Sequence, residues 1–543
     1  MTTTNIRAAL AADPDVGAGN VVPKLIEHGA PLDGPGLAFD TQVDGLPARH
    51  GLTLGQLDER TAARAAWLSE HGVRPRDPVA VYVSTAADGL LAFMALARLG
   101  AIAALMNPHM PPDVAAEYIR RLRGTALLTD SAHRDALGGR DLGLDRIWDV
   151  AELGEGDPAK APPAYRHHAD DPIAITHSSG TTRMPAAVVH SNASLFAALR
   201  ILRLSAPRAQ GTERILSVLP FAHAAGIMTI NHALCVRGEL LFLSQQHDGG
   251  AILDAIEQWR PSGVFGFAVT WAELARYDLR ERDLDSVSLW FNTGDCAHEP
   301  HVRPLVQAGS RQVATRDGVK RVAGSSFVDG LGSTEMGNSA FYMVHRADTA
   351  HYGRCVGKPH RFAGIALLDP ETGEEVPAGR VGHFGLKSPT LAPGYWNDSV
   401  ATYRNRLNGY YLTGDLMYRD DEGYYYHVDR AVDAVDLGGG EWLYTAMSEE
   451  RILTACPDVR DCTVVAVRAE GRVTTDVLLE LHAGADPDAD RAPAIRAALT
   501  GAAAATLRRI IVICDDDQLI TGPTGKVRKF LMRQRHLAET AVN

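Results

Sequence analysis

The sequence predicts a protein of mixed α/β and α+β class, with a large N-terminal domain built of α/β subdomains and a small C-terminal α+β domain. The chain has 543 residues, whereas a single hydrophobic core stops growing at roughly 250–300 residues. Its first half alternates helical and extended hydrophobic patterns with short connections, which is typical of a parallel sheet covered by helices. The C-terminal part instead holds three short strand patterns and one helical pattern.

The N-terminal elements follow from the spacing of apolar residues. Residues 52–71 carry apolar side chains at helical spacing and end before a turn-rich segment, so we expect a helix there. Val79–Val83 is a β-branched run that predicts a buried strand. Leu90–Met106 is the most apolar stretch, but it is shorter than the ~20 residues that span a bilayer. It predicts a buried helix that turns into a strand at residues 101–106, and no membrane partner.

A Pro- and Ala-rich linker separates these elements from a further short strand at Ile173–Thr176. The adjacent residues His167 and His168 in this linker indicate a solvated loop rather than a metal site, because no third ligand is near them in the sequence.

The C-terminal domain is expected to contain strands at Val464–Val467, Val477–Leu481 and Ile510–Ile513, with a helix over Ala494–Leu507. An aromatic-rich turn segment precedes residue 430 and places the join there. We therefore expect an N-terminal domain of residues 1–429, a hinge of residues 430–433 and a C-terminal domain of residues 434–543.

Composition excludes several classes of protein. Lys and Arg total 54 against 66 Asp and Glu, a formal net charge of -12, which is wrong for a protein that binds nucleic acid through a basic surface. The N-terminus shows no signal-peptide pattern, and a cytoplasmic location is expected. The cysteines have neither disulfide-framework nor zinc-site spacing and are expected to be small buried hydrophobes: Cys235, Cys296, Cys355, Cys456, Cys462 and Cys514.

A hydroxyl-rich loop directly after the strand at 173–176 is the most informative segment. Its serine, threonine and glycine residues can aim hydroxyl and backbone N–H groups at a phosphate chain, although a polar turn explains the same residues. It is not a Walker A loop. The residues in question are Ser178, Ser179, Gly180, Thr181, Thr182 and Arg183.

Two later segments carry carboxylates beside glycines. DGLGSTEMG, residues 329–337, begins like a dinucleotide fingerprint, but Glu335 stands where that fingerprint has its last glycine. A carboxylate there, beside Thr334, suits a divalent cation and its phosphate oxygens. In YLTGDL, residues 411–416, Asp415 can accept two hydrogen bonds from vicinal ribose hydroxyls. Each segment taken singly is as consistent with a capped turn as with a site.

The order of the motifs resembles that of a known family. The hydroxyl-rich loop, GSTE, TGDL, an Arg after a turn and PTGK at residues 523–526 follow one another as in the adenylate-forming superfamily of acyl-CoA synthetases, peptide-synthetase adenylation domains and luciferase. VGKP at residues 356–359 and GYW at 394–396 also fit, so the resemblance covers nearly the whole chain. It implies an ATP- and Mg²⁺-dependent ligase that activates an acid as its AMP anhydride, releases pyrophosphate and rotates a mobile C-terminal cap.

The resemblance implies a role for each matching residue. The hydroxyl-rich loop would bind the β- and γ-phosphates, with Gly332 among the nucleotide-binding residues. Thr334 would contact the α-phosphate and Glu335 would hold Mg²⁺. Asp415 would bind the ribose, supported by Arg430. Lys526, carried by the cap, would stabilise the charge that builds on the α-phosphoryl oxygens.

The acid-binding pocket follows by the same analogy. His223, in LPFAHAAG, either lines this pocket or is a hydrogen-bonded core histidine. The other residues expected to face the substrate are Phe267, Thr270, Asn292, Thr293, Gly294, Gly330 and Leu331.

Departures from the family pattern concern the phosphate loop and the hinge. Ala186 stands where the family usually has a Lys, and Arg183 is a candidate to compensate. The hinge carries Asp433 and Asp436, and Asp436 replaces another common Lys. These acids would repel anionic CoA and favour an amine acceptor, although Asp436 is equally consistent with a solvated loop residue.

Three hypotheses follow. The leading one is an acyl-CoA-synthetase-like ligase acting on a small-molecule carboxylic acid, with CoA or a separate carrier protein as acceptor. The alternative is an ATP-dependent diazotase of natural-product biosynthesis, which adenylates nitrite and transfers it to an aryl amine. A nucleotide-binding pseudoenzyme is the alternative of another class. A tiny polar cavity beyond the α-phosphate would favour nitrite, and a long apolar one a fatty acid.

Overall fold

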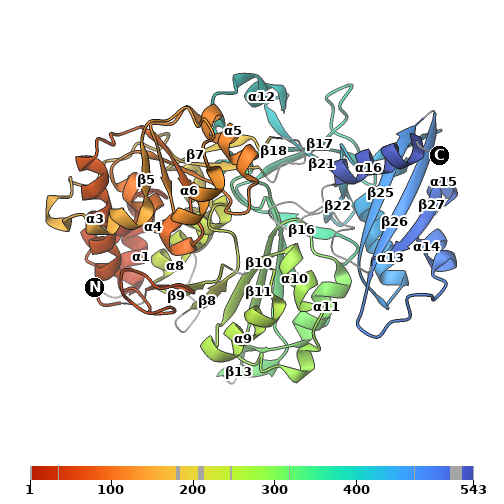
Figure 1. The fold of residues 1–543 in the computed structure, drawn as a ribbon. Helices are drawn as coiled ribbons and strands as arrows, with labels where there is room; N and C mark the ends of the chain where they lie inside the picture. Colours follow the sequence, from red (N-terminus) through yellow and green to blue (C-terminus); the bar gives the residue numbers. More distant parts are fainter. Residues whose placement is uncertain are drawn as a thin grey trace.

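A computed structural model describes residues 3–34, 36–178, 184–205, 213–244, 247–316, 318–469, 471–499, 501–513 and 529–541. It has the predicted mixed α/β architecture, in which a large N-terminal part is followed by a smaller C-terminal part (Figure 1). Over the described ranges no helix is long and apolar enough to cross a membrane.

The first sheet of the N-terminal part has the strand order β19-β7-β6-β3-β2-β4-β5. Its central strands run parallel, and β7 and β19 join antiparallel. The strands are β2 (Pro78–Tyr82), β3 (Ile102–Leu105), β4 (Ala126–Thr129), β5 (Ile147–Asp149), β6 (Pro172–His177), β7 (Ala187–Ser191) and β19 (Gly394–Tyr395). The helices connected to them are α3 (Leu54–Glu70), α4 (Ala86–Arg98), α5 (Pro112–Leu122) and α6 (Ser131–Leu137).

These elements confirm the sequence prediction for the first half. The helix α3 begins just after Thr53, whose hydroxyl accepts from the N–H of Gln56 while the Gln56 side chain accepts from the N–H of Thr53. Such a capping box satisfies two otherwise unpaired donors and fixes where the helix starts. The apolar stretch divides into α4 and β3, with the turn at Gly100 (φ +74°) as expected.

The second sheet follows the path β1-β9-β8-β10-β11-β14-β15-β16-β22-β21-β18-β17, with β20 paired to β21. It is parallel as far as β14 and antiparallel beyond. Its strands are β1 (Leu37–Phe39), β8 (Arg214–Ser217), β9 (Glu239–Phe242), β10 (Gly263–Phe267), β11 (Leu289–Gly294), β14 (Ser326–Leu331), β15 (Phe341–His345), β16 (Cys355–Pro359), β17 (Gly364–Leu368), β18 (Gly382–Lys387), β20 (Arg406–Leu407), β21 (Tyr410–Arg419) and β22 (Tyr425–Arg430).

The remaining elements of the N-terminal part surround these sheets (Figure 1). They are α1 (Thr3–Ala12), α2 (Val21–Glu27), α7 (Ser194–Leu199), the π-helical turn η3 (Arg200–Leu204), α8 (Ala224–Val236), α9 (Gly249–Trp259), α10 (Ala268–Leu274), α11 (Glu299–Gln307), α12 (Ser399–Arg404) and the hairpin β12 (Ser310–Thr315) and β13 (Gly318–Ala323). Short 3₁₀ turns lie at Val150–Glu155, Pro158–Lys160 and Leu279–Glu281.

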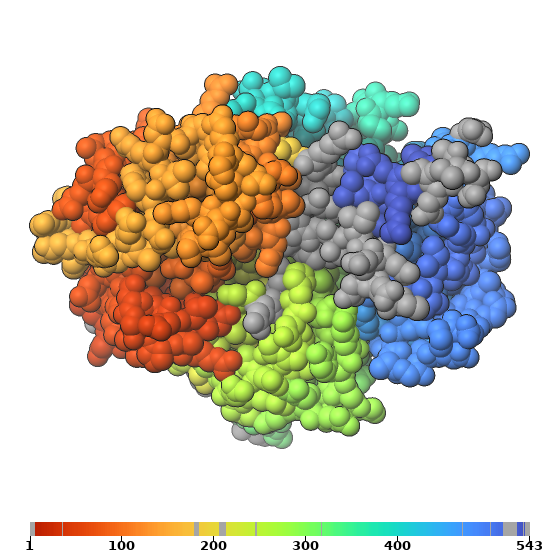
Figure 2. All heavy atoms as spheres, viewed as in Figure 1, coloured from red at the N-terminus to blue at the C-terminus, as the bar shows by residue number. Residues whose placement is uncertain are grey.

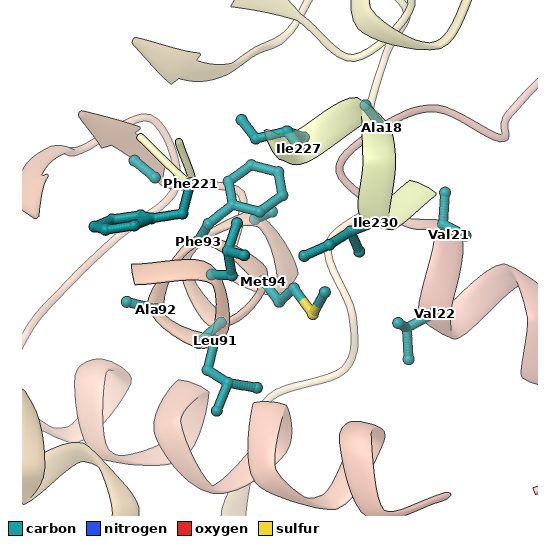
Figure 3. Packing of buried hydrophobic residues seen from close by; sticks show 14 of the residues in the cluster. Ala18, Val21, Val22, Leu91, Ala92, Phe93, Met94, Phe221, Ile227 and Ile230 are labelled. Atoms are coloured by element: carbon teal, nitrogen blue, oxygen red, sulfur yellow. The ribbon is translucent and has the colours of Figure 1, made fainter. Parts of the chain in front are cut away.

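The largest hydrophobic core lies where α4 meets α8. Phe93 of α4 packs beside Phe221 and Ile227, as Figure 3 shows. A Cβ at Gly89 would stand 2.2 Å from the Phe221 ring, so only glycine allows this approach. Because α8 begins at residue 224, this core fixes the position of the preceding His223.

The C-terminal part has its own small core around Leu443, Ile452 and Val464. Its elements are β23 (Val435–Gly438), β24 (Glu441–Leu443), α13 (Thr445–Ala455), β25 (Val459–Ala469), β26 (Arg472–Leu481), α14 (Ala492–Leu499), α15 (Gly501–Ala505), β27 (Leu507–Val512) and α16 (Lys529–Ala541). The predicted strands lie within β25, β26 and β27, with Ile513 just beyond the last. The boundaries placed at residues 430–433 stay a prediction.

Two sequence predictions need correction. The helix expected over residues 494–507 is divided into α14 and α15, and Leu507 already belongs to β27. Gly501, the first residue of α15, has φ +48°, a left-handed backbone conformation that does not continue an α-helix, so α15 is a separate piece. His167 is buried rather than solvated, and its Nε2 hydrogen bonds to the carbonyl of Ala97 at 2.8 Å.

The cysteines within the described ranges are free and buried, as predicted: Cys235, Cys296, Cys355, Cys456 and Cys462. Cys514 lies outside the described residues.

The two parts contact each other through α11 and α13. The Nδ1 of His298, just before α11, lies 2.6 Å from a carboxylate oxygen of Glu450 in α13. His301 of α11 hydrogen bonds to the carbonyl of Arg460 at 2.8 Å. Figure 2 shows the blue C-terminal part against the green segment that holds α10 and α11.

Replacing His298 by Gln should change how stability depends on pH. Burial alone lowers the pKa of His298, but the Glu450 carboxylate outweighs burial and raises it. A raised pKa means that the stabilisation is complete below the ordinary histidine value and is lost as pH rises through the raised value. Thermal unfolding from neutral to alkaline pH should show this loss in the unmodified chain, and His298→Gln should be less stable at neutral pH by about 1–3 kcal/mol. An exposed-histidine variant, His50→Gln, is the control; equal pH profiles for all three chains would contradict the assignment.

Candidate active site

The neck of the predicted phosphate loop is closed by two hydrogen bonds. Ser178 follows β6 directly, and its N–H donates to the carbonyl of Ala186 at 3.0 Å. The N–H of Ala186 donates to the Ser178 hydroxyl at 3.2 Å. Ser178 and Ala186 therefore pair at the base of the loop. Ala186 is the residue that stands where the family usually has a lysine. Ser179, Gly180, Thr181, Thr182 and Arg183 lie outside the described residues.

Thr334 and His223 are in direct contact. The Thr334 hydroxyl lies 3.2 Å from Nε2 of His223, while Nδ1 of His223 accepts the N–H of Ala225 at the start of α8. Accepting at Nδ1 places the proton of a neutral ring on Nε2, which then donates to Thr334. Phe267 packs edge-on against the ring at 5.2 Å between centroids. His223 is thus a hydrogen-bonded helix cap in direct contact with Thr334. Whether it also lines the acid-binding pocket stays a prediction.

Glu335 is held from a distant strand. The hydroxyl of Tyr395, in β19, donates to Oε1 of Glu335 at 3.1 Å, and Tyr411 lies 3.4 Å beyond it. The N–H of Ala392 also donates to the Glu335 carbonyl at 2.9 Å. Burial, and then the Glu335 carboxylate, raise the pKa of Tyr395 to about 12, so this phenol stays a donor. The carboxylate is therefore oriented before any ligand arrives.

Asp415 and Arg430 are cross-strand neighbours. They pair in register between β21 and β22, and Nε of Arg430 lies 3.4 Å from Oδ1 of Asp415. On the other side, Nε2 of His427 lies 3.4 Å from the same oxygen, and Arg354 donates to Nδ1 of His427 at 2.7 Å. Burial alone would raise the pKa of Asp415, but Arg430 and His427 outweigh it and lower the pKa. Asp415 is thus a buried, ionised acceptor at neutral pH.

Six of the predicted pocket residues are not among those that line the cavity described below: His223, Phe267, Thr270, Asn292, Gly294 and Leu331. Thr270, Asn292 and Leu331 are buried in the interior, and the substrate-binding role of all six stays a prediction. Asn292 accepts from the indole of Trp271 at 2.8 Å and donates to Asp329 at 2.6 Å, so its amide is used for packing. Leu331 belongs to a separate hydrophobic cluster. Strand alternation explains the positions of Asn292 in β11 and Leu331 in β14, because successive side chains of a strand point to opposite faces and the neighbours Thr293 and Gly330 line the cavity. Thr270 lies in α10 instead.

The chain passes close to Ser339 at two glycines, and a side chain at Gly330 would force Ser339 to move. A Cβ at Gly330 would stand 2.5 Å from the Ser339 hydroxyl oxygen, and one at Gly332 would stand 3.3 Å from its Cα. Gly294, with φ +91°, would bring a Cβ to 3.3 Å from Phe267. A side chain at any of these glycines would therefore crowd Ser339 or Phe267.

A cavity of about 600 Å³ lies beside Gly330, between α7, α8 and the second sheet. Of the predicted pocket residues, Thr293 and Gly330 line it. Most of its wall is aliphatic or aromatic, with Phe265, Phe291 and Met228 among the lining residues. This volume is typical of a site for a drug-sized molecule.

The hinge acids are less available than the sequence suggests. Asp433 is buried, and Nη1 of Arg533 lies 2.7 Å from its Oδ1. The Asp436 carboxylate is exposed but accepts the N–H of Gly438 in a local turn at 2.8 Å. The predicted repulsion of CoA by Asp433 is therefore weakened, because the charge of Arg533 offsets the charge of Asp433.

Lys526 lies outside the described residues. The helix α16 begins at Lys529, whose ammonium group is buried against Glu449 at 2.7 Å and the Thr445 hydroxyl at 2.9 Å. The Thr445 hydroxyl in turn donates to Asp429 at 3.0 Å. The C-terminal helix α16 is thereby linked, through Thr445, to Asp429 of β22.

Sequence reasoning missed several residues of the site. Tyr395 lies in the GYW segment, which was recognised as a motif but given no role. His427 precedes the Arg430 motif by three residues in an aromatic run that was interpreted only as a turn. Asn338 and Ser339 follow GSTEMG directly and line the cavity, so proximity to that motif is the signal that could have found them.

The fold and this arrangement define an adenylate-forming enzyme. Residues 40–396 match the model of the family described as AMP-binding enzyme. The chain therefore belongs to the AMP-binding enzymes, and it is an ATP-dependent, AMP-forming ligase.

Similarities to individual proteins add to the family match. The chain is 42% identical, over 98% of both chains, to 3-aminoavenalumate diazotase from a Streptomyces species. Its fold matches a crystal structure of an anthranilate CoA ligase in complex with anthranoyl-AMP, with a TM-score of 0.83, 20% identity and coverage of 97% of this chain and 98% of that one. It also matches O-succinylbenzoate coenzyme A synthetase from Bacillus subtilis with ATP and magnesium, with a TM-score of 0.73, 20% identity and coverage of 94% and 98%.

Proposed function

We propose that this ligase is a diazotase, which uses ATP to activate nitrite and transfers its nitrogen to an aryl amine. The observation that carries the proposal is the 42% identity to a diazotase over 98% of both chains. The cavity does not meet the expectation of a tiny polar cavity for nitrite, because about 600 Å³ is far more than nitrite needs. It suits an organic second substrate such as an aryl amine, but an acyl-CoA ligase would use the same cavity for its acid, so the proposal rests on the sequence identity.

The residues at the centre fit ATP and Mg²⁺. The Glu335 carboxylate is oriented by Tyr395, as a ligand for a hard cation should be. The ionised Asp415 would accept from the ribose hydroxyls, with Arg430 beside it. The Ser178 hydroxyl stands at the neck of the phosphate loop. Mg²⁺, when bound, would offset negative charge on the phosphate oxygens.

The chemistry balances in two steps. A nitrite oxygen attacks the α-phosphorus of ATP, forming a nitrite–AMP anhydride as the bond to pyrophosphate breaks. The amine nitrogen then attacks the nitrite nitrogen, AMP leaves with the bonding electrons, and the amine releases a proton to give the N-nitrosamine. The nitrosamine tautomerises to the diazohydroxide, which takes up a proton and loses water to give the diazonium ion. Thr334, held by His223, would donate to the α-phosphoryl oxygens in the first step.

The test is to supply ATP, Mg²⁺, isotope-labelled nitrite and an aminoaryl acid at slightly alkaline pH, where spontaneous diazotisation is slow. We expect nitrite-dependent pyrophosphate release and a diazonium ion that a phenol traps as a labelled azo product. A chain with Glu335→Gln and a reaction without ATP are the controls. If CoA and the aryl acid give a thioester instead, and nitrite has no effect, the chain is an acyl-CoA ligase and the proposal fails. ATP binding with no pyrophosphate release from any acid would indicate a pseudoenzyme.

Replacing Tyr395 by Phe should raise the Mg²⁺ concentration that the reaction needs. The variant keeps the ring but removes the hydroxyl that donates to Glu335. Loss of such an orienting partner typically lowers metal affinity by about 10-fold. The measurement is pyrophosphate release against Mg²⁺ concentration, and saturating Mg²⁺ should restore most of the rate. Tyr403→Phe, at an exposed tyrosine, is the control; unchanged Mg²⁺ dependence in Tyr395→Phe would remove the positioning role.

A further inference from the structure

A β-bulge turns His427 toward the Asp415 carboxylate. Asp415 of β21 pairs with Arg430 of β22, but two residues further along β21, Met417 pairs with His427 rather than with Val428. Since successive side chains of a strand point to opposite faces, an unbroken ladder would place His427 on the face away from Asp415. The extra residue in β22 reverses this, as bulges re-aim side chains in other sheets. His427, Asp415 and Arg430 therefore share one face of the sheet.

Arg354, just before β16, fixes both the main chain and the ring of His427. The N–H of His427 donates to the Arg354 carbonyl at 3.0 Å, and Nε of Arg354 donates to the His427 carbonyl at 3.3 Å. The guanidinium also donates to Nδ1 of the ring at 2.7 Å. Both side chains are buried, and Oδ1 of Asp295 lies 3.3 Å from the guanidinium. Arg354 has φ +64°, a left-handed conformation that is unfavourable for a residue with a side chain, and these contacts compensate for it.

The position of the ring proton of His427 follows from the contact with Arg354. A guanidinium has donors and no acceptor, so Nδ1 of His427 accepts and the single ring proton is on Nε2. Nε2 is buried and lies 3.4 Å from Oδ1 of Asp415, and it has no shorter hydrogen bond to any described residue. Nε of Arg430 lies 3.4 Å from the same oxygen. Two donors on Oδ1 limit the rotation of the carboxylate and hold Oδ2 on the opposite side.

The two donors differ in how firmly they are held. The side chain of Arg430 is 45% exposed, whereas that of His427 is 4% exposed and is fixed from behind by Arg354. A long, half-exposed side chain has more conformational freedom than a buried ring. His427 is therefore the more rigid of the two groups that orient Asp415.

We propose that His427 is a positioning residue for the nucleotide, which directs the Asp415 carboxylate toward the two vicinal ribose hydroxyls, and that Arg354 sets the direction of the His427 donor. The inference rests on the ribose-binding role proposed for Asp415. It goes beyond that role, because it makes the selection of a ribonucleotide depend on His427, which acts through Asp415. Hydrogen bonds from hydroxyl groups to a carboxylate are strong only when their direction is suitable.

The test compares ATP with 2′,3′-dideoxy-ATP, which lacks both hydroxyls, by calorimetric binding to the full chain with Mg²⁺. The unmodified protein should bind ATP about 10- to 100-fold more tightly than the dideoxy nucleotide. His427→Asn places its amide oxygen where Nδ1 stands, so Arg354 keeps an acceptor, but the side chain is too short to reach Asp415. We expect this variant to lose about 10-fold of the preference for ATP and to bind the dideoxy nucleotide almost as the unmodified chain does.

Two further variants separate positioning from a structural role. His427→Gln is the conservative replacement, because its amide nitrogen stands where Nε2 does and can still donate to Asp415, so it should keep most of the preference. His345→Asn is the matched control, at a buried histidine of β15 in the same sheet that stacks on Tyr352, and it should keep all of the preference.

The inference is overturned if His427→Asn keeps the full preference or loses affinity for both nucleotides alike. A loss of the preference in His427→Gln would also contradict it. An unmodified chain that binds both nucleotides equally would remove the ribose-binding role of Asp415 and the inference together. Binding is measured without nitrite or an amine, so the expected selectivity without nitrite-dependent pyrophosphate release would refute the proposed diazotase function alone.

Discussion

Replacing Lys526 by Ala should reduce nitrite-dependent pyrophosphate release by about 100- to 1,000-fold, the usual effect of removing one preorganised donor from a developing oxyanion. The prediction rests on the PTGK motif, since Lys526 itself lies outside the described residues. The structure adds that α16, which begins three residues later, is anchored through Lys529 to Glu449.

The affinity for ATP separates this role from simple unfolding or weaker binding. If Lys526 acts on the transition state, Lys526→Ala should bind ATP within a few-fold of the unmodified chain while losing the rate. Lys320→Ala, at an exposed lysine of β13, is the matched control. A parallel loss of ATP affinity and rate would show that Lys526 holds the substrate in its ground state, which would contradict the assigned role.

Local sequence patterns predicted much of the fold because they depend on near neighbours. The start of α3 is set by Thr53 and Gln56, and the turn after α4 by Gly100, all of which can be identified in the sequence. The failures have non-local causes. His167 is buried because the distant Ala97 carbonyl accepts its hydrogen bond, and no pattern in the linker indicates that partner.

The candidate site likewise combines residues that stand in sequence motifs with residues that only the tertiary structure brings near them. Thr334, Glu335 and Asp415 stand in recognisable motifs, and the structure places each with a partner. Those partners, such as Tyr395, come from other elements and carry no motif of their own for this role.

The second large effect is expected at Asp415. Asp415→Asn keeps the shape of the side chain but removes its charge, and two contacts depend on that charge: Arg430 at 3.4 Å and His427 at 3.4 Å. Hydrogen bonds from ribose hydroxyls to a carboxylate are about twice as strong as neutral ones. We therefore expect ATP affinity to fall by about 10- to 100-fold, with a loss of about 1–3 kcal/mol in unfolding free energy.

The pH dependence of ATP binding provides an independent measurement. Because the pKa of Asp415 is lowered, its stabilising charge is fully present above the ordinary Asp value and is lost only as pH falls through the lowered value. Affinity should thus stay level from neutral pH to mildly acidic pH. Asp476→Asn is the matched control, since Asp476 is also buried and paired with arginines, Arg508 at 2.5 Å and Arg509 at 2.7 Å, but in the cap sheet. The control should lose stability and keep ATP affinity. If both variants bind ATP equally well, Asp415 does not bind the ribose, and its pairing with Arg430 only joins β21 to β22.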